Sequence, residues 1–142
     1  MYVTGFFCLI LSLISFSGFS LELGVDRLFQ PEYIHLVKDK RVALATNHTG
    51  ITSTFQKTEQ IFVSESRKGT FDLICFFCPE HGFRGVEWAC TAVANETHEC
   101  GVPIYSLHGK TRKPTPDMLQ GVDVIVFDMQ DLGCRSYTYA ST

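Results

Sequence analysis

Four short runs of almost uninterrupted apolar residues constrain the fold of this chain more than any other feature. They span residues 41–46 (RVALAT), 71–77 (FDLICFF), 102–107 (VPIYSL) and 122–127 (VDVIVF). Such runs are typical of strands that are buried on both faces, as in a parallel sheet covered by helices. The sequence therefore predicts a doubly wound α/β domain with a mainly parallel sheet.

Helices are expected in the stretches that flank these strands. The expected helices cover residues 23–40, 52–68, 115–119 and 137–142. In the second of them, Phe55, Ile61 and Phe62 are placed toward the core. Thr115 precedes a proline and is expected to cap the third.

Polar residues follow each predicted strand at the point where it ends. Thr46 and Asn47 follow the first strand, Glu80 and His81 the second, His108 the third, and Asp128, Gln130 and Asp131 the fourth. In open α/β sheets, ligands bind outside the carboxyl ends of the strands. This pattern predicts a binding or active site at one edge of the sheet.

The segment PEHGFRG (residues 79–85) carries two proton-transfer groups, Glu80 and His81, directly after a strand. A carboxylic acid beside an apolar strand end can have a raised pKa. Together with Asp128 or Asp131, Glu80 would supply the two carboxylates of a glycosidase. The alternative is a solvated loop whose charges are incidental.

The segment after the fourth strand offers groups that suit a sugar. Asp128, Gln130 and Asp131 can bind hydroxyls, Arg135 can hold a carboxylate, and Tyr137 can stack on a ring. The alternative is that Asp128 caps a helix and the tyrosines pack in the core.

Composition and motifs exclude several other classes. A net charge of −3 argues against nucleic-acid binding, and no GxGxxG motif indicates a dinucleotide, so no cofactor is expected. Cys75 and Cys78 have CxxC spacing, which leaves zinc or redox chemistry as a weaker hypothesis. Residues three apart in a strand point to opposite faces, however, so a buried Cys75 and a loop Cys78 are favoured, with no metal site.

Residues 1–20 have the properties of a signal peptide. Gly5 to Phe19 is uncharged and too short to span a bilayer comfortably, and Gly18 and Ser20 provide small residues before a cleavage point at Leu21. The chain is therefore expected to be exported to the periplasm or the extracellular space, the alternative being an uncleaved membrane anchor. Residues 21–142 would form the remaining domain.

Four stretches together resemble the NamZ-type exo-β-N-acetylmuramidases. They are ALATNHTG (residues 43–50), PEHGFRG (79–85), YSLHGKTRKPTP (105–116) and FDMQDLGCRSYTY (127–139). The resemblance implies a Rossmann-like N-terminal domain, followed in the family by a C-terminal domain across a cleft. It implies a glycoside hydrolase that releases terminal N-acetylmuramic acid from peptidoglycan fragments. The resemblance makes Glu80, His81 and Asp128 catalytic and lines the site with Asn47, Arg84, Gln130, Asp131, Arg135 and Tyr137.

Two departures from the family are visible in the sequence. Cys78 and Cys134 stand where the family usually has small residues other than cysteine. Members are also two to three times longer, so a C-terminal domain encoded downstream is expected. The alternative is a truncated, inactive remnant that at most binds muramyl sugars.

Overall fold

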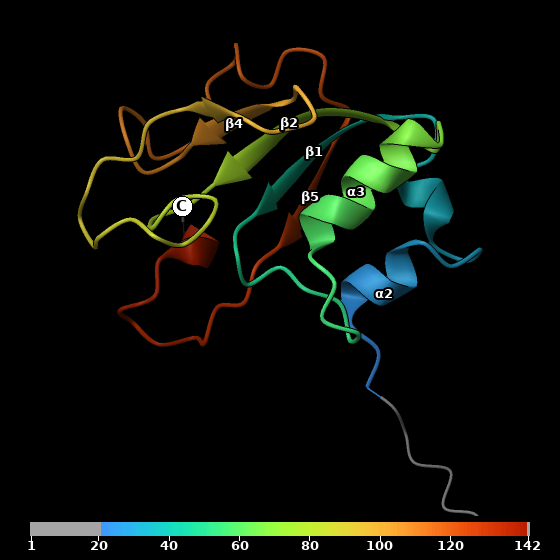
Figure 1. The fold of residues 1–142 in the computed structure, drawn as a ribbon, viewed down its shortest axis with the longest axis horizontal. Coiled ribbons are helices and arrows are strands. Elements are labelled where there is room, and N and C mark those ends of the chain that lie inside the picture. Colours follow the sequence, from blue (N-terminus) through green and yellow to red (C-terminus); the bar gives the residue numbers. More distant parts are fainter. Residues whose placement is uncertain (1–20, 142) are drawn as a thin grey trace, which may run out of the picture.

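The computed structural model describes residues 21–141, and the expected export signal lies outside these described residues. The elements in chain order are α2 (Gly24–Leu28), the 3-10 helix η1 (Ile34–Leu36), β1 (Arg41–Thr46), α3 (Thr58–Arg67), β2 (Asp72–Cys78), β3 (Glu96–Thr97), β4 (Pro103–Ser106), β5 (Val124–Asp128) and the 3-10 helix η2 (Tyr139–Ser141). The described strands form one sheet in the order β3–β4–β2–β1–β5 (Figure 1).

The topology confirms the predicted α/β class with a mainly parallel sheet. Strands β4, β2, β1 and β5 are parallel, and only β3 pairs antiparallel, with β4. The chain starts at β1, proceeds outward through β2 and β4, and then returns to place β5 on the other side of β1. The reversal of strand order between β1 and β5 is the position at which doubly wound sheets bind ligands.

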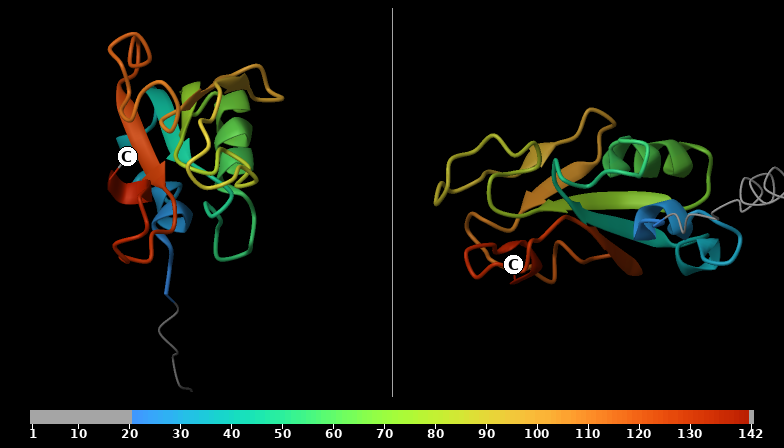
Figure 2. Two further views of the ribbon diagram at one scale, coloured as in Figure 1. Left: turned by 90° about the vertical axis from the view of Figure 1, so that its left-hand side faces the viewer. Right: turned by 90° about the horizontal axis from the view of Figure 1, so that it is seen from below.

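Two apolar layers enclose the central strands because side chains alternate between the faces. One layer joins Val42, Leu44 and Phe76 of the sheet to Phe62 of α3. The other contains Ala43, Ala45, Cys75, Phe77 and Leu107. Figure 2 shows α3 on one side of the sheet and the shorter η2 on the other. On that second side Ile125 and Phe127 of β5 remain 46% and 51% exposed.

Two of the expected helices are shorter than the sequence indicated. The expected helix over 23–40 is divided into α2 and η1, since Pro31 disfavours helical backbone in the residue before it. The helix expected from residue 52 begins only at Thr58, because the Thr52 hydroxyl accepts the Gln56 N–H at 3.0 Å and closes a turn. The placement of Phe55 in the core is therefore wrong: its side chain is 83% exposed.

The expected helix over 115–119 is a series of turns. Thr115 does cap it, since its hydroxyl accepts the Met118 N–H at 3.4 Å. The segment ends at Gly121, which has φ 79°, and so few residues cannot offset the cost of starting a helix. At the end of the described chain only the 3-10 helix η2 forms. Cys78, expected in a loop, is instead the buried last residue of β2.

Candidate functional site

The loops that follow β1, β2, β4 and β5 meet at the carboxyl edge of the sheet. Two glycines allow their close approach. A Cβ on Gly50 would lie 2.8 Å from the Asp128 carbonyl oxygen, and a Cβ on Gly85, which has φ 71°, would overlap the His48 ring. The ATNHTG motif therefore packs against β5 at Gly50, and the PEHGFRG motif packs against the ATNHTG motif at Gly85. Only glycine fits at either position.

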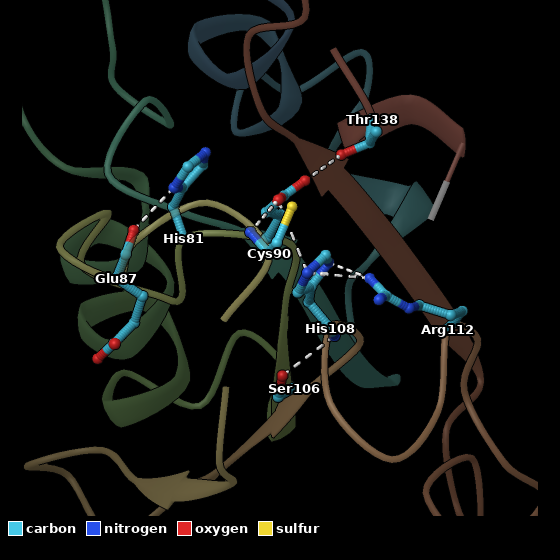
Figure 3. A network of polar contacts seen from close by, with 8 residues as sticks. His81, Glu87, Cys90, Ser106, His108, Arg112 and Thr138 are labelled. Carbon is cyan, nitrogen blue, oxygen red and sulfur yellow. Dashed lines mark hydrogen bonds and ion pairs between the residues drawn. The ribbon is translucent and has the colours of Figure 1, made fainter. Parts of the chain in front are cut away.

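The Glu80 carboxylate, at this edge of the sheet, is held by two hydrogen bonds and lies close to a histidine. Its Oε1 accepts the Cys90 N–H at 2.9 Å, and its Oε2 accepts the Thr138 hydroxyl at 3.1 Å. His108 Nε2 lies 3.7 Å from the same Oε1. Figure 3 shows Cys90, Thr138 and His108 close to one another, although they come from three separate loops. The Glu80 side chain nevertheless keeps 14% of its surface exposed.

These contacts lower the pKa of Glu80. The Cys90 backbone N–H holds the pKa of Glu80 below its usual value, and the Thr138 hydroxyl and His108 add to this effect against the cost of burial. Hydrogen bonds to the charged form favour ionisation. The raised pKa that an apolar strand end can give a carboxyl group is not found here, and Glu80 is an anion at neutral pH.

His108 and Arg112 lie behind Glu80, and the sequence assigned neither of them a role in the site. The backbone N–H of His108 donates to the Ser106 hydroxyl oxygen at 3.1 Å. The Arg112 guanidinium contacts the His108 ring (Figure 3). Burial lowers the pKa of His108. A guanidinium only donates, so the ring is neutral and offers Arg112 a lone pair. The sequence placed His108 at this edge, but nothing in it marked the contact with Glu80.

His81 lies beside Glu80 but turns its ring toward Glu87 (Figure 3). His81 Nδ1 is 2.8 Å from the Glu87 carbonyl oxygen, which can only accept. Nδ1 therefore carries a proton, and Nε2 is the atom available for proton transfer. Glu80 and His81 line one side of a pocket of about 200 Å³, and residues 136–139, which include Tyr137, line the other.

Asp128 lies at the same edge in a different environment. Its Oδ2 accepts the hydroxyl of Thr58, the buried first residue of α3. Its backbone carbonyl accepts the Thr46 hydroxyl at 2.7 Å. Burial raises the pKa of Asp128, against the effect of Thr58. In the described residues no hydrogen bond joins it to Glu80, which follows β2, and β1 separates β2 from β5.

The Asn47 side chain connects the loops after β1 and β5. Its Oδ1 accepts the N–H and the hydroxyl of Thr49 at 2.9 and 2.6 Å, and the Thr49 hydroxyl in turn accepts the Gln130 N–H at 2.9 Å. The Asn47 Nδ2 is buried and makes no hydrogen bond of good geometry among residues 21–141, although it lies near enough to the Tyr139 hydroxyl to act against the raised pKa of that tyrosine. A buried donor of this kind is suited to an acceptor from a ligand.

The remaining residues selected by sequence are more dispersed. Arg84 is paired with Glu99 at 3.3 Å on the side of the β3–β4 turn. Asp131 accepts the backbone N–H groups of Gly133 and Ala140 at 2.9 and 3.1 Å, so it organises the loop before η2. Arg135 is exposed. Tyr137 is 42% exposed and packs edge-on against the buried Tyr139, with ring centres 6.0 Å apart.

Two further observations concern residues 21–141 as a whole. No group of three histidine, cysteine, aspartate or glutamate side chains there is placed to hold a metal ion. Nor does that part of the chain contain a helix with the length and apolarity needed to span a bilayer.

Comparison with known proteins supports one family. Residues 42–142 match the family model described as exo-β-N-acetylmuramidase NamZ, N-terminal. The chain is 42% identical over 123 residues to the peptidoglycan β-N-acetylmuramidase NamZ of Bacillus subtilis (strain 168), which covers 86% of this chain and 29% of that protein. It also resembles the crystal structure of a DUF1343 family protein from Bacteroides fragilis, with a TM-score of 0.68 and 39% identity over 84% of this chain and 29% of the other. The chain thus spans less than a third of the length of these relatives.

Proposed function

The chain belongs to the NamZ family of exo-β-N-acetylmuramidases, with its match in their N-terminal domain, and from this we propose that it acts on peptidoglycan-derived sugars. The reaction is hydrolysis of the glycosidic bond that holds a terminal N-acetylmuramic acid. We further propose that residues 1–20 direct the chain out of the cytoplasm, to the compartment in which such fragments arise. The uncharged stretch from Gly5 to Phe19 supports this part of the proposal.

One observation carries the assignment of the site. Glu80 follows a central strand at the carboxyl edge of the sheet, lies in a pocket with His81 and Tyr137, and is kept ionised by hydrogen bonds from Cys90 and Thr138 on two loops. A mostly buried carboxylate is costly unless it is hydrogen-bonded, and ionisable groups with shifted pKa values that lie in pockets are concentrated at functional sites. An oxocarbenium-like transition state is positively charged, and a fixed carboxylate stabilises it.

In this proposal, Glu80 is the acid/base residue and begins the reaction as a base. Its carboxylate accepts a proton from the water that attacks the anomeric carbon as the glycosidic bond breaks. His81, when protonated on Nε2, donates the proton that the leaving oxygen requires. His108 lies 3.7 Å from Glu80 and supports it from behind, and the Asp128 carboxyl group joins the end of β5 to the start of α3.

Recognition of the sugar is assigned to Tyr137 in this pocket and to polar groups elsewhere on the loops that follow the strands. Asn47 Nδ2 is a buried donor that makes no hydrogen bond of good geometry in the described chain, and Tyr137 presents a half-exposed ring on which a sugar can stack. Gln130, Asp131, Arg84 and Arg135 complete the proposed binding set. The lactyl carboxylate of muramic acid provides a partner for one of the arginines.

The test is turnover of a chromogenic β-N-acetylmuraminide by the full chain. Glu80→Gln is expected to reduce the rate by a factor of about 10² to 10⁴, since it removes a proton acceptor while preserving shape. Glu32→Gln, at an exposed residue of the turn before η1, is the matched control and should retain full activity. Equal rates in the wild type and Glu80→Gln would reject the assignment of Glu80.

A second candidate function is binding of muramyl sugars without hydrolysis. It is favoured by the pocket beside Glu80, whose lining, Tyr137 included, can hold a sugar ring whether or not the glycosidic bond is cleaved. Calorimetric titration of the chain with N-acetylmuramic acid, in parallel with the turnover assay, separates the two functions. Binding without turnover supports the second candidate, whereas the absence of both would overturn the proposed sugar specificity. N-acetylglucosamine, which lacks the lactyl carboxylate, is the control ligand.

A further inference from the structure

We propose that Cys100 and His98 form a thiol–imidazole pair that undergoes thiol–disulfide exchange with small disulfides bearing carboxylates. The pair lies in the turn between β3 and β4 and takes no part in the sugar site described above. The proposal does not depend on the proposed function.

The two side chains are in direct contact. His98 Nδ1 lies 3.0 Å from Cys100 Sγ and accepts the Cys100 backbone N–H at 3.2 Å. A nitrogen that accepts this N–H carries a lone pair, so the contact with sulfur is one in which the thiol donates. A base within reach of a thiol proton is the arrangement that activates a cysteine nucleophile.

The position of the imidazole is fixed by its surroundings. The backbone turn is closed by His98, whose carbonyl accepts the Gly101 N–H and whose N–H donates to the Val102 carbonyl, both at 2.8 Å. The His98 ring packs against Phe76 and Phe83, with ring centres 5.0 and 5.8 Å apart. The imidazole is therefore already positioned beside the sulfur. Its side chain loses little conformational entropy when a disulfide binds.

A surface pocket of about 410 Å³ adjoins the pair and provides room for a small molecule. His98, Glu99 and Cys100 of the β3–β4 turn line it together with Gln60, Val63, Ser64 and Arg67 of α3. Arg67 brings a guanidinium to this pocket, and guanidinium groups pair with carboxylates in a two-pronged geometry, whereas the Glu99 carboxylate is already paired with Arg84. The expected ligand is thus a small disulfide with at least one carboxylate.

The exchange step is balanced without a further oxidant. His98 Nδ1 takes the thiol proton, and the Cys100 sulfur attacks one sulfur of the small disulfide. A new S–S bond forms between Cys100 and that half, while the original S–S bond breaks. The released half leaves as a thiolate and takes up the proton from His98. The products are a mixed disulfide on Cys100 and one free small thiol.

Other cysteines of the described chain lack this combination of features. Burial raises the pKa of Cys75 to about 11 and that of Cys78 to about 12, which disfavours the reactive thiolate. Cys90 and Cys134 are exposed but do not line this pocket. All five cysteines in residues 21–141 are free, so each can be compared within the same molecule.

The experiment treats the full chain with limiting dithiobis-nitrobenzoate, a small disulfide that carries carboxylates. Release of thionitrobenzoate gives the rate, and peptide mass mapping gives the site. Cys100 is expected to be modified first, and Cys100→Ser to remove the fast phase. If Cys90 or Cys134 reacts faster than Cys100 in the unmutated chain, the proposal is overturned.

Two variants test the roles of the neighbouring groups. His98→Gln should slow the fast phase by at least about tenfold, as loss of a proton acceptor predicts, whereas His35→Gln, at an exposed histidine in η1, should not. An unchanged rate in folded His98→Gln, as judged by circular dichroism, would refute the pair. Arg67→Gln should slow reaction with the charged probe and spare reaction with uncharged hydroxyethyl disulfide. Equal effects on both probes would reject the preference for carboxylates.

Discussion

Glu80 and Asp128 follow parallel strands at the same edge of the sheet, yet their surroundings shift their pKa values in opposite directions. Glu80 receives a backbone N–H and a hydroxyl from two loops and has a lowered pKa. Asp128 is partly buried beside Thr58 and has a raised pKa. The two carboxyl groups are therefore shifted in opposite directions from their ordinary pKa values, although the topology gives them equivalent positions.

This difference separates what the sheet provides from what the loops provide. The sheet brings a carboxylate to the end of β2 and another to the end of β5. Whether each is charged depends on donors from residues far away in sequence, such as Cys90 and Thr138 for Glu80. An open pocket adjoins Glu80, whereas the Asp128 side chain joins β5 to α3. The first arrangement suits chemistry and the second suits support.

The largest expected effect on stability comes from a substitution that fills the space between Gly50 and Asp128. Gly50→Ala would put a methyl group against the Thr46 hydroxyl and 2.8 Å from the Asp128 carbonyl oxygen. Because one of these neighbours is backbone, the loop must shift, and we expect a loss of about 2 to 3 kcal/mol of unfolding free energy. Urea denaturation followed by circular dichroism measures it.

Gly24→Ala is the matched control for this substitution. Gly24 begins α2, and a Cβ there would meet nothing within 4 Å. Replacing a helical glycine by alanine is expected to be neutral or to stabilise by up to about 1 kcal/mol. A loss in Gly50→Ala no greater than that in Gly24→Ala would contradict the close packing of the loop on β5.

The sequence predicted the sheet well because the information is local. Buried runs such as RVALAT and FDLICFF can form only central strands, and the motifs that follow them must then share one edge. The sequence also located Glu80 and His81 next to each other. It did not predict the two-residue strand β3, since so short an element has no periodicity to detect.

The state of the site depended on contacts that no local pattern contains. The lowered pKa of Glu80 comes from Cys90 and Thr138, which are 10 and 58 residues away along the chain. Arg84 follows Glu80 by only four residues, yet it pairs with Glu99 across the β3–β4 turn. Side-chain direction in a loop is decided by tertiary packing, so the membership of a site is less predictable than its place on the fold.

A smaller effect is expected from removing the donor to Asp128. Thr58→Val keeps the shape of a fully buried residue and deletes the hydroxyl that donates to Asp128 Oδ2. We expect a loss of about 1 to 2 kcal/mol at neutral pH, the usual cost of leaving a buried acceptor unpaired. In an Asp128→Ala background the same substitution should cost less than about 0.5 kcal/mol. Equal costs in both backgrounds would show that Thr58 acts only by packing.

The smallest effect, and the sharpest test of the comparison, is the slope of stability against pH. The lowered pKa of Glu80 gives stability that is present above its unfolded value, about 4.3, and is lost as the pH falls through its folded value. The raised pKa of Asp128 acts in the opposite sense, because the folded state gains stability as the pH falls through its folded value. Glu80→Gln should therefore make the loss of stability in acid shallower, and Asp128→Asn should make it steeper. Urea denaturation between about pH 7 and pH 3 at constant ionic strength measures both slopes. If both variants changed the slope in the same direction, the two carboxylates would not differ in the way that the structure shows.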